Sequence, residues 1–600
     1  MSQKHDRRKI RASRAATIAA LALSAVLLKG MEAKAWEWLN ITSGTRELDI
    51  AGSDVSHDIS QSSFYDGGAV LLSGAGTRLH FYGNGDLKFH DSISKSGKGG
   101  AIAVLSGAAL SIDIDGVLRF ADNFAHTRGG ALFFQNSSGC LSAKDIIFSG
   151  NSNSTGYNYG DKNGGALTLE KASVALVAEN DIAFRHNSAG GNSKGGALFA
   201  DDNSSVTFSA KNVKFESNST ETGWGGALRI NKSSVVSIDA ENDFSVVGNL
   251  SVGNGGGVHV DNSTLRVAAN TICFADNSSP VGGDDTLIGV GGGSRGINFG
   301  IQTYLARESI TFSGNRAGHH GGGLLVDRGA QTELYASGDI VFMNNSADVF
   351  GGGVATHFLN SYAEMSAKVS VQSDANILFI ANASGARDGT TDNGGGGAVF
   401  IDKNDTGTFA ADGDIVFRDN YAANNAEITR GGAISVAGVV SFDAGGSLTF
   451  DGNFINSIES GQGGAIAVVS GGSLDLGEER TKNVVFANNH VSGDKADDSI
   501  VLQGGAIFIE EGSLRVAATE KIVLKDNYAH SCHALAQGGA IYVGADDVRA
   551  LLTLTAPEIE FSGNHVEAAH DDDDGHTAKG GALYNHNGHI SIAADALSVT

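Results

Sequence analysis

The stretch GGALFADDNSSVTFSAKNVKFESN, from Gly195 to Asn218, contains the pattern that decides the fold. It opens with two glycines and an alanine, and it closes with the tetrapeptide Phe215-x-x-Asn218. Between these ends lie three short runs in which every second residue is apolar, the pattern of a strand with one buried face. Three short strands separated by turns predict one rung of a coiled chain rather than a whole domain. The apolar pairs are Leu198 and Ala200, Val206 and Phe208, and Val213 and Phe215.

The same pattern recurs along almost the whole chain of 600 residues, so the chain is built from an internal repeat. Each double glycine is followed by F-x-x-N or by a degenerate copy, and we assign Phe89, Phe244 and Leu524 to the phenylalanine place in three such copies. The double glycines begin at Gly67, Gly99, Gly129, Gly164, Gly195, Gly225, Gly256, Gly292, Gly322, Gly352, Gly396, Gly431, Gly463, Gly504, Gly538 and Gly580.

Spacing within the repeat identifies the architecture. The distance from the double glycine to the phenylalanine is 18 to 23 residues in every complete rung but one, whereas the asparagine and the next double glycine are 6 to 16 residues apart. Strands of constant length with one elastic connection are typical of a parallel β-helix, whose insertions accumulate as loops at a corner. We therefore predict an all-β fold, a right-handed parallel β-helix of about sixteen rungs with three short strands each. It would span residues 61–600, after an N-terminal cap at residues 36–60.

The repeated residues have structural roles in this prediction. Glycine suits a corner where the backbone takes a positive φ or approaches a neighbouring coil. The phenylalanines are expected to stack along the axis, and the asparagines to hydrogen-bond to the asparagines of adjacent rungs. The motif residues that we select as representatives are Gly195, Gly196, Ala197, Phe215 and Asn218, together with Phe417, Asn420, Gly431, Gly432 and Ala433.

The N-terminus has the composition of a secretory signal peptide, predicted at residues 1–35. A basic segment precedes an apolar run, and Ala33 and Ala35 supply a small-x-small cleavage site that would make Trp36 the first mature residue. The formal net charge of −25 makes nucleic acid an unfavourable partner. The chain has only three cysteines, so we expect no disulfide framework.

No catalytic, cofactor or metal site can be recognised in the sequence. His319-His320 is expected to lie in a solvated turn, since adjacent side chains face different ways. Cys532-His533 lacks a third group that would orient a nucleophile, and the run Asp571–Asp574 lacks the glycine and glutamate of a calcium loop. Aligning the rungs by their phenylalanines places Arg185, Glu216, Met343, Ile380, Arg418 and Asp451 in one outward column, where carboxylates are not concentrated.

Repeated GGA[ILV] alternating with F-x-x-N, as in FRDN at Phe417 with GGAI at Gly431, resembles the polymorphic membrane proteins of chlamydiae. The resemblance covers roughly residues 61–600. It implies type V secretion, in which a β-helical passenger is exported through its own C-terminal outer-membrane barrel and acts at the cell surface as an adhesin. No barrel sequence is present up to Thr600, which falls inside a rung, so we expect the native chain to continue.

The sequence thus favours a surface-exposed, adhesin-like passenger of an outer-membrane protein of a Gram-negative bacterium. Its partners would be a host-cell or surface receptor or glycan, and the outer membrane through the barrel. Two alternatives remain open, because fold alone does not decide function. One is a secreted β-helix polysaccharide lyase or hydrolase, and the other is a purely structural envelope protein.

Overall fold

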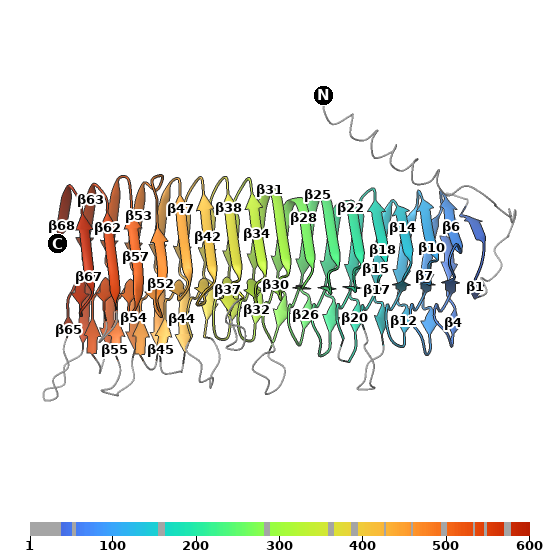
Figure 1. Ribbon diagram of the computed structural model, residues 1–600, viewed down its shortest axis with the longest axis horizontal. Helices are drawn as coiled ribbons and strands as arrows, with labels where there is room; N and C mark the ends of the chain where they lie inside the picture. The colour runs from blue at the N-terminus through green and yellow to red at the C-terminus, as the bar shows by residue number, and fades with distance from the viewer. Residues whose placement is uncertain are drawn as a thin grey trace, which may run out of the picture.

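A computed structural model describes residues 38–50, 56–153, 163–191, 193–280, 289–357, 365–385, 394–424, 428–457, 460–493, 501–531, 535–544, 549–568 and 578–600. Within these ranges the regular elements are all β-strands, and every strand pairing is parallel. The strands stack along one axis into a rod, with the N-terminal rungs (blue) and C-terminal rungs (red) at opposite ends (Figure 1). The predicted parallel β-helix is therefore confirmed.

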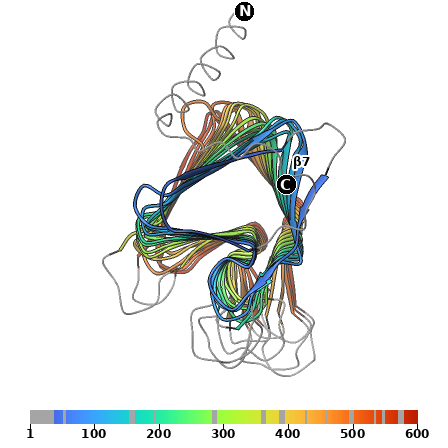
Figure 2. The same cartoon turned by 90° about the vertical axis from the view of Figure 1, so that its right-hand side faces the viewer.

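Each rung contributes strands to three long sheets. In the rung that begins at Gly195, β21 (Leu198–Asp201) follows the glycines, β22 (Ser205–Glu216) comes next, and β23 (Ser219–Thr220) follows the asparagine. We call the three sheets the glycine sheet, the wide sheet and the asparagine sheet, with 17, 30 and 16 strands. Viewed along the axis, the rungs superpose in a closed outline with a smaller lobe at one edge (Figure 2).

The glycine sheet determines where the outward-facing residues discussed below lie. Its strands are β1 (Leu39–Ile41), β5 (Val70–Ser73), β9 (Ile102–Leu105), β13 (Leu132–Gln135), β17 (Leu167–Glu170), β21, β24 (Leu228–Asn231), β27 (Val258–Asp261), β30 (Ser294–Ile297), β33 (Leu324–Asp327), β37 (Val354–His357), β41 (Val399–Ile401), β46 (Ile434–Val436), β51 (Ile466–Val468), β56 (Ile507–Ile509), β61 (Ile541–Val543) and β66 (Leu583–Asn585).

The number of rungs differs slightly from the sixteen predicted. The additional strand of the glycine sheet is β1, which precedes the first double glycine and pairs with β5. From the same segment, β2 (Thr45–Asp49) pairs with β6 (Arg78–Gly83), and β3 (Ser56–Ile59) pairs with β7 (Asp86–His90). The segment before the repeat therefore covers the first rung by continuing its strand pairing, although it lacks the GGA motif.

The second and third predicted strands of a rung both lie in the wide sheet. They remain separate in most rungs, but they join into one strand in β22, β25 (Val235–Val247), β28 (Thr264–Ala275) and β31 (Ile301–Ser313). A register shift between adjacent joined strands lies at the turn position, for example between Ala210 and Asn212. The sheet bends there without breaking the strand.

The corner after the asparagine, whose length varies from rung to rung, contains more strands than the sequence predicts. Besides the asparagine sheet, it contains a five-stranded sheet in the C-terminal half of the rod. The strands of this sheet are β45 (Ile428–Arg430), β50 (Ser460–Gln462), β55 (Val501–Gln503), β60 (Leu535–Gln537) and β65 (Ala578–Lys579). Ala422, Ile455, Val491 and Leu502 form a small separate core beneath it.

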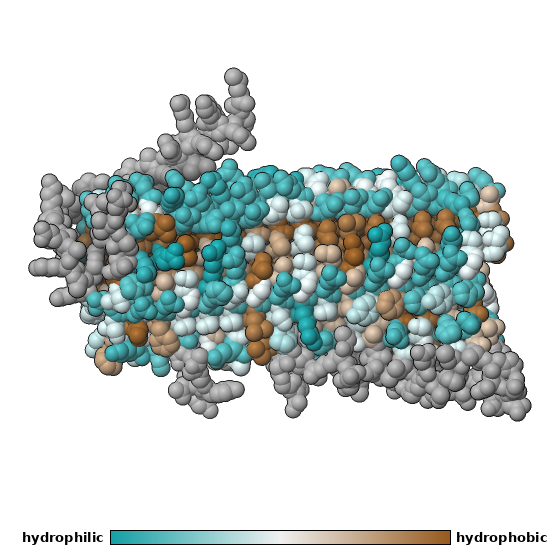
Figure 3. Space-filling view, turned by 180° about the vertical axis from the view of Figure 1, so that it is seen from behind, coloured by the Kyte–Doolittle hydropathy of each residue, from teal (hydrophilic) through white to brown (hydrophobic). Residues whose placement is uncertain are grey.

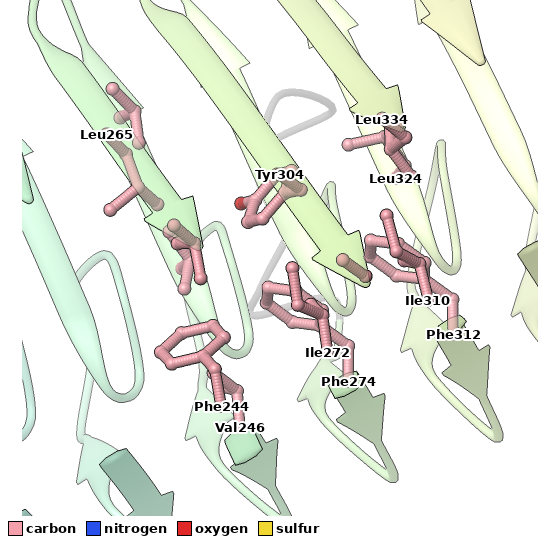
Figure 4. Close-up of a cluster of buried hydrophobic side chains, with 14 of the residues drawn as sticks. Phe244, Val246, Leu265, Ile272, Phe274, Tyr304, Ile310, Phe312, Leu324 and Leu334 are labelled. Carbon is pink, nitrogen blue, oxygen red and sulfur yellow. The ribbon is translucent and has the colours of Figure 1, made fainter. Parts of the chain in front are cut away.

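Phenylalanines of the repeat stack along the axis inside one continuous core. Four pairs from Phe89–Phe120 to Phe184–Phe215 and six from Phe274–Phe312 to Phe450–Phe486 have ring centroids 4.5–5.2 Å apart and interplanar angles of 9° or less. Phe89 and Leu524 occupy the column as assigned, whereas the assignment of Phe244 is wrong. Val246 pairs with both Phe215 and Phe274, because it stands three residues before Asn249. Figure 4 shows Val246 beside Phe274 of the next rung.

Candidate functional surfaces

The motif residues selected from the sequence all lie in the scaffold. Gly195 has φ +70°, and a Cβ on Gly196 would stand 2.0 Å from the carbonyl oxygen of Gly226. Ala197 is fully buried, and the ring of Phe215 stacks on that of Phe184 at 4.9 Å. In the second copy Gly431 has φ +67°, and a Cβ on Gly432 would stand 2.0 Å from the carbonyl oxygen of Gly464. Ala433 is buried, and Phe417 stacks on Phe450.

The asparagines form a continuous buried ladder from Asn123 to Asn564. Asn218 Nδ2 donates to Asn249 Oδ1 at 3.0 Å and to the carbonyl oxygen of Phe184 at 3.0 Å. Asn420 makes the same two bonds, with Asn453 and Phe379. Each amide therefore satisfies the donors and acceptors at a corner of the helix, and none is available to a ligand.

A second buried column of side chains, which we call the seam, lies on the outer side of the glycine sheet. It consists of the middle residues of the glycine-sheet strands, whose side chains alternate with those in the main core. These residues are 8% exposed or less, because the residues just before the double glycines cover them. From β9 to β61 the seam column comprises Ala103, Phe133, Thr168, Phe199, Arg229, His259, Arg295, Leu325, Ala355, Phe400, Ser435, Ala467, Phe508 and Tyr542.

Aromatic and cationic side chains close the seam from outside. Lys98 Nζ lies 4.5 Å from the centroid of the Phe133 ring. Trp224 stacks on His259 at 5.9 Å and also covers the Arg229 guanidinium at 4.9 Å. Farther along, Phe350 stacks on Phe400 at 4.2 Å between ring centroids, so the seam is filled over most of the rod.

The centre of the seam contains buried ion pairs. Arg229 is 1% exposed, and its NH2 group donates to Asp261 Oδ2 at 2.7 Å. Arg295 donates to Asp327 Oδ2 at 3.2 Å. Breaking one partner of such a pair is costly, because it leaves a buried charge without compensation. Each of the two ion pairs therefore joins adjacent coils.

Burial changes the protonation equilibria of this cluster. It lowers the pKa of Arg229 to about 10, against the opposing attraction of Asp261. It also lowers the pKa of Arg295, which Asp327 opposes. The pKa of His259 lies well below its usual value, because the ring is buried and because Arg229 and Arg295 are both positive. His259 is therefore neutral near pH 7.

A column of polar residues at the end of the glycine-sheet strands was missed from the sequence. Glu170, Asp201, Asn231 and Asp261 lie in register or diagonally on adjacent rungs. Each carboxylate already has partners. Arg128 and Gln135 bind Glu170, Asn231 and Lys232 bind Asp201, and Arg229 and Asn298 bind Asp261. The column is thus a network of ion pairs and amides rather than a row of unengaged acids.

The signal for this seam was present in the sequence but was not used. Aromatic and charged residues alternate with the two core positions after the glycines, as in Phe133, Phe199, Arg229 and Phe400. The sequence shows that these residues face outward. It does not show that the chain preceding the glycines folds back over them.

The predicted outward column of the wide sheet is present in the described rungs. Arg185 pairs with Glu216 and Arg418 with Asp451 across adjacent strands, and both pairs form partly exposed ion pairs. Most of the face seen in Figure 3 is hydrophilic, with an interrupted apolar band along the rod. The partly exposed ion pairs of the column, such as Arg185–Glu216, contribute little to stability.

The expected solvated turn at His319-His320 is wrong. His319 and His320 are 7% and 8% exposed, and His320 stacks on Phe350 at 5.3 Å between ring centroids. His320 directly precedes the double-glycine corner, and residues at this position cover the seam. Among the described residues, no group of three or more His, Cys, Asp or Glu is arranged to hold a metal ion.

Several sequence-based predictions lie outside the described residues. These are the cleavage site at Ala33, Ala35 and Trp36, the Cys532-His533 pair and the run Asp571–Asp574. In the part of the chain that the structure describes, no helix is long and apolar enough to cross a membrane.

Comparisons with known proteins identify relatives of the chain. The family model for the Chlamydia polymorphic membrane protein repeat matches residues 309–327. Probable outer membrane protein PmpF of Chlamydia trachomatis serovar D is 27% identical over 349 residues, which cover 54% of this chain and 32% of the relative. Probable outer membrane protein pmp21 of Chlamydia pneumoniae is 25% identical over 352 residues, 49% of this chain and 21% of the relative.

The matched regions thus cover about a third or less of each of these curated relatives. No solved structure matches the chain. The resemblance inferred from the GGA[ILV] and F-x-x-N motifs is confirmed by the repeat model and by both relatives.

Proposed function

We propose that the chain is the surface-exposed passenger of an autotransporter-type outer-membrane protein and that it acts as an adhesin. The proposal starts from two findings: the chain carries the repeat of the chlamydial polymorphic membrane proteins, and it is related to outer-membrane proteins of that family. Both relatives are named as probable outer membrane proteins, which supports a location at the outer membrane and cell surface. The partner would be a receptor or glycan on a host cell or another surface.

The observation that carries this proposal is that the interior of each rung is constant whereas its exterior varies. The glycines, phenylalanine and asparagine are occupied in coil stacking, and the described carboxylates of the seam are paired. What differs from rung to rung is the outer face and the corner before the double glycine, whose length ranges from 6 to 16 residues. A rigid rod with a constant interior and a variable exterior suits multipoint contact along its length.

The net charge of −25 narrows the class of partner. Sulfated polysaccharides and other polyanions would be repelled by this surface at physiological ionic strength. Neutral or cationic surfaces are therefore the favoured partners.

Adhesion can be tested with the purified chain coupled to latex beads. We expect the beads to bind cultured epithelial cells more strongly than albumin-coated beads. Deleting residues 219–249 removes one Asn-to-Asn repeat and should weaken binding only in part, because contact is distributed over many rungs. Binding no greater than that of albumin beads would contradict the proposal. So would turnover of an acidic polysaccharide that a single outer-face substitution abolishes, since that result would indicate an enzyme.

A further inference from the structure

Among the residues that the structure describes, the seam is open at the N-terminal end of the rod, although it is filled farther along. In the first rungs its column begins with Asn40, Leu71 and Ala103, none of which carries a ring. The first aromatic residue of the column is Phe133, under Lys98. Before that point lies an open pocket of about 440 Å³, lined by Trp38, Asn40, Tyr65, Asp66, Leu71, Ser96 and Gly97.

Two aromatic rings form one wall of this pocket. The centroids of Trp38 and Tyr65 are 6.3 Å apart, and their planes are inclined by 30°. Trp38 is fixed by a hydrogen bond from Nε1 to the carbonyl oxygen of Gly67 at 2.8 Å. Tyr65 is 69% exposed. Its ring lies against Trp38 on one side and is otherwise in water, and an exposed aromatic ring at a pocket mouth is typical of a contact surface.

The backbone around Tyr65 is held in place by the next rung. Ser94 Oγ donates to the carbonyl oxygen of Tyr65 at 2.7 Å, and Ser96 Oγ donates to that of Phe64. Asp66 Oδ1 accepts the backbone N–H of Lys98 at 2.8 Å, which orients its carboxylate. A Cβ on Gly97 would stand 2.3 Å from the same oxygen, so glycine is needed for this approach. The backbone at Tyr65 and the Asp66 carboxylate are therefore preorganised rather than part of a loose loop.

We propose that this pocket binds a neutral sugar of one or two pyranose rings, and this inference rests on the proposed adhesive function. The apolar face of a pyranose ring would pack on Tyr65 and Trp38, in the place that phenylalanine fills in later rungs. Its hydroxyl groups would meet the side chains of Asn40, Asp66 and Ser96. A wall of rings with a few polar groups is the usual composition of a small-molecule site.

Charge and size select this class of ligand. Asp66 in the pocket and the net charge of −25 disfavour sialylated and uronic sugars. A quaternary ammonium group would also be attracted by aromatic rings and a carboxylate. However, such a compact cation would leave most of a 440 Å³ pocket empty, and the two rings lie side by side rather than around a common centre.

The test is saturation-transfer NMR with the purified chain and a panel of neutral disaccharides: lactose, N-acetyllactosamine, N,N′-diacetylchitobiose and maltose. We expect signal transfer to at least one of them, and Tyr65→Ala should weaken its affinity about tenfold. Phe64→Ala is the matched control. Phe64 is 68% exposed and adjacent to Tyr65, but it does not line the pocket, so its replacement should leave affinity unchanged. Midpoints of thermal unfolding equal to that of the unaltered chain would show that neither substitution disturbs the fold.

Three results would overturn the inference. One is no transfer to any disaccharide of the panel with folded protein, and another is an equal loss of affinity in F64A and Y65A. The third is binding of choline that Asp66→Asn abolishes, which would indicate a cation site. The bead assay separates this inference from the adhesive function on which it rests. If the beads adhere to cells but the chain binds no sugar, only the sugar site is refuted. If the chain binds a sugar through Tyr65 but the beads do not adhere, the adhesive function is refuted instead.

Discussion

Replacing Asn345 by alanine should loosen the rod locally, because this side chain makes four buried hydrogen bonds. Its Nδ2 donates to Asn382 Oδ1 at 3.0 Å and to the carbonyl oxygen of Phe312 at 2.8 Å. Its Oδ1 accepts from the backbone N–H of Asn315 at 3.1 Å and from Asn315 Nδ2 at 2.9 Å. Alanine would leave at least two donors of Asn315 buried without an acceptor.

A buried group that loses its partner costs about 1–3 kcal/mol, so we expect a total of about 3 kcal/mol for N345A. The rungs of a solenoid open semi-independently, so the loss should appear locally rather than as a uniform fall in stability. Native-state hydrogen exchange followed by mass spectrometry measures this directly. Amides of the rungs containing Asn315, Asn345 and Asn382 should exchange about 150-fold faster, whereas those of distant rungs should be unchanged.

The adjacent asparagine supplies a matched control. Asn344 is exposed and has φ +55°, a conformation that glycine adopts without strain, so N344G should change exchange rates by less than about threefold. If N345A resembled N344G, the ladder would contribute no net stability. The reasoning from buried hydrogen bonds would then be refuted.

Three further predictions concern the corners and the seam. Gly432→Ala should abolish folding, since its Cβ would stand 2.0 Å from the carbonyl oxygen of Gly464. Gly471→Ala, at φ +83° with no atom within 4 Å of the added Cβ, should cost only about 1 kcal/mol, and soluble yield and Tm distinguish the two variants. Asp261→Asn should destabilise the seam by about 3–5 kcal/mol in denaturant unfolding, because it leaves Arg229 buried without a carboxylate, and the double variant Arg229→Met/Asp261→Asn should recover most of this loss. Burial raises the pKa of Asp405 from 3.8 to about 7, so the unfolded chain loses this proton first and local stability should fall as pH rises from about 4 to about 7. Asp405→Asn should remove that slope in hydrogen exchange measured across this pH range, and an unchanged slope would contradict the assignment.

Sequence alone was sufficient for the parallel β-helix, because a solenoid has the same local interactions in every rung. The alternation after each double glycine identifies core residues such as Leu228 and Ile230, and both are buried. The spacing of F-x-x-N places the phenylalanine and asparagine columns. The error at Phe244 shows the limit of residue type as a guide, since the distance to Asn249 correctly selects Val246.

The sequence does not show which outward-facing side chains of the glycine sheet are covered by the segment that precedes each double glycine. Alternation predicts that Arg229, His259 and Phe400 face away from the core, but all three are buried. They are covered by residues such as Trp224 and Phe350, which precede the glycines and return over the outer face of the sheet. The corner has no periodic pattern, so its path depends on contacts between segments that no local rule relates. Tertiary structure alone therefore decided that the seam closes around buried ion pairs and that, among the described residues, it is open beside Trp38 and Tyr65.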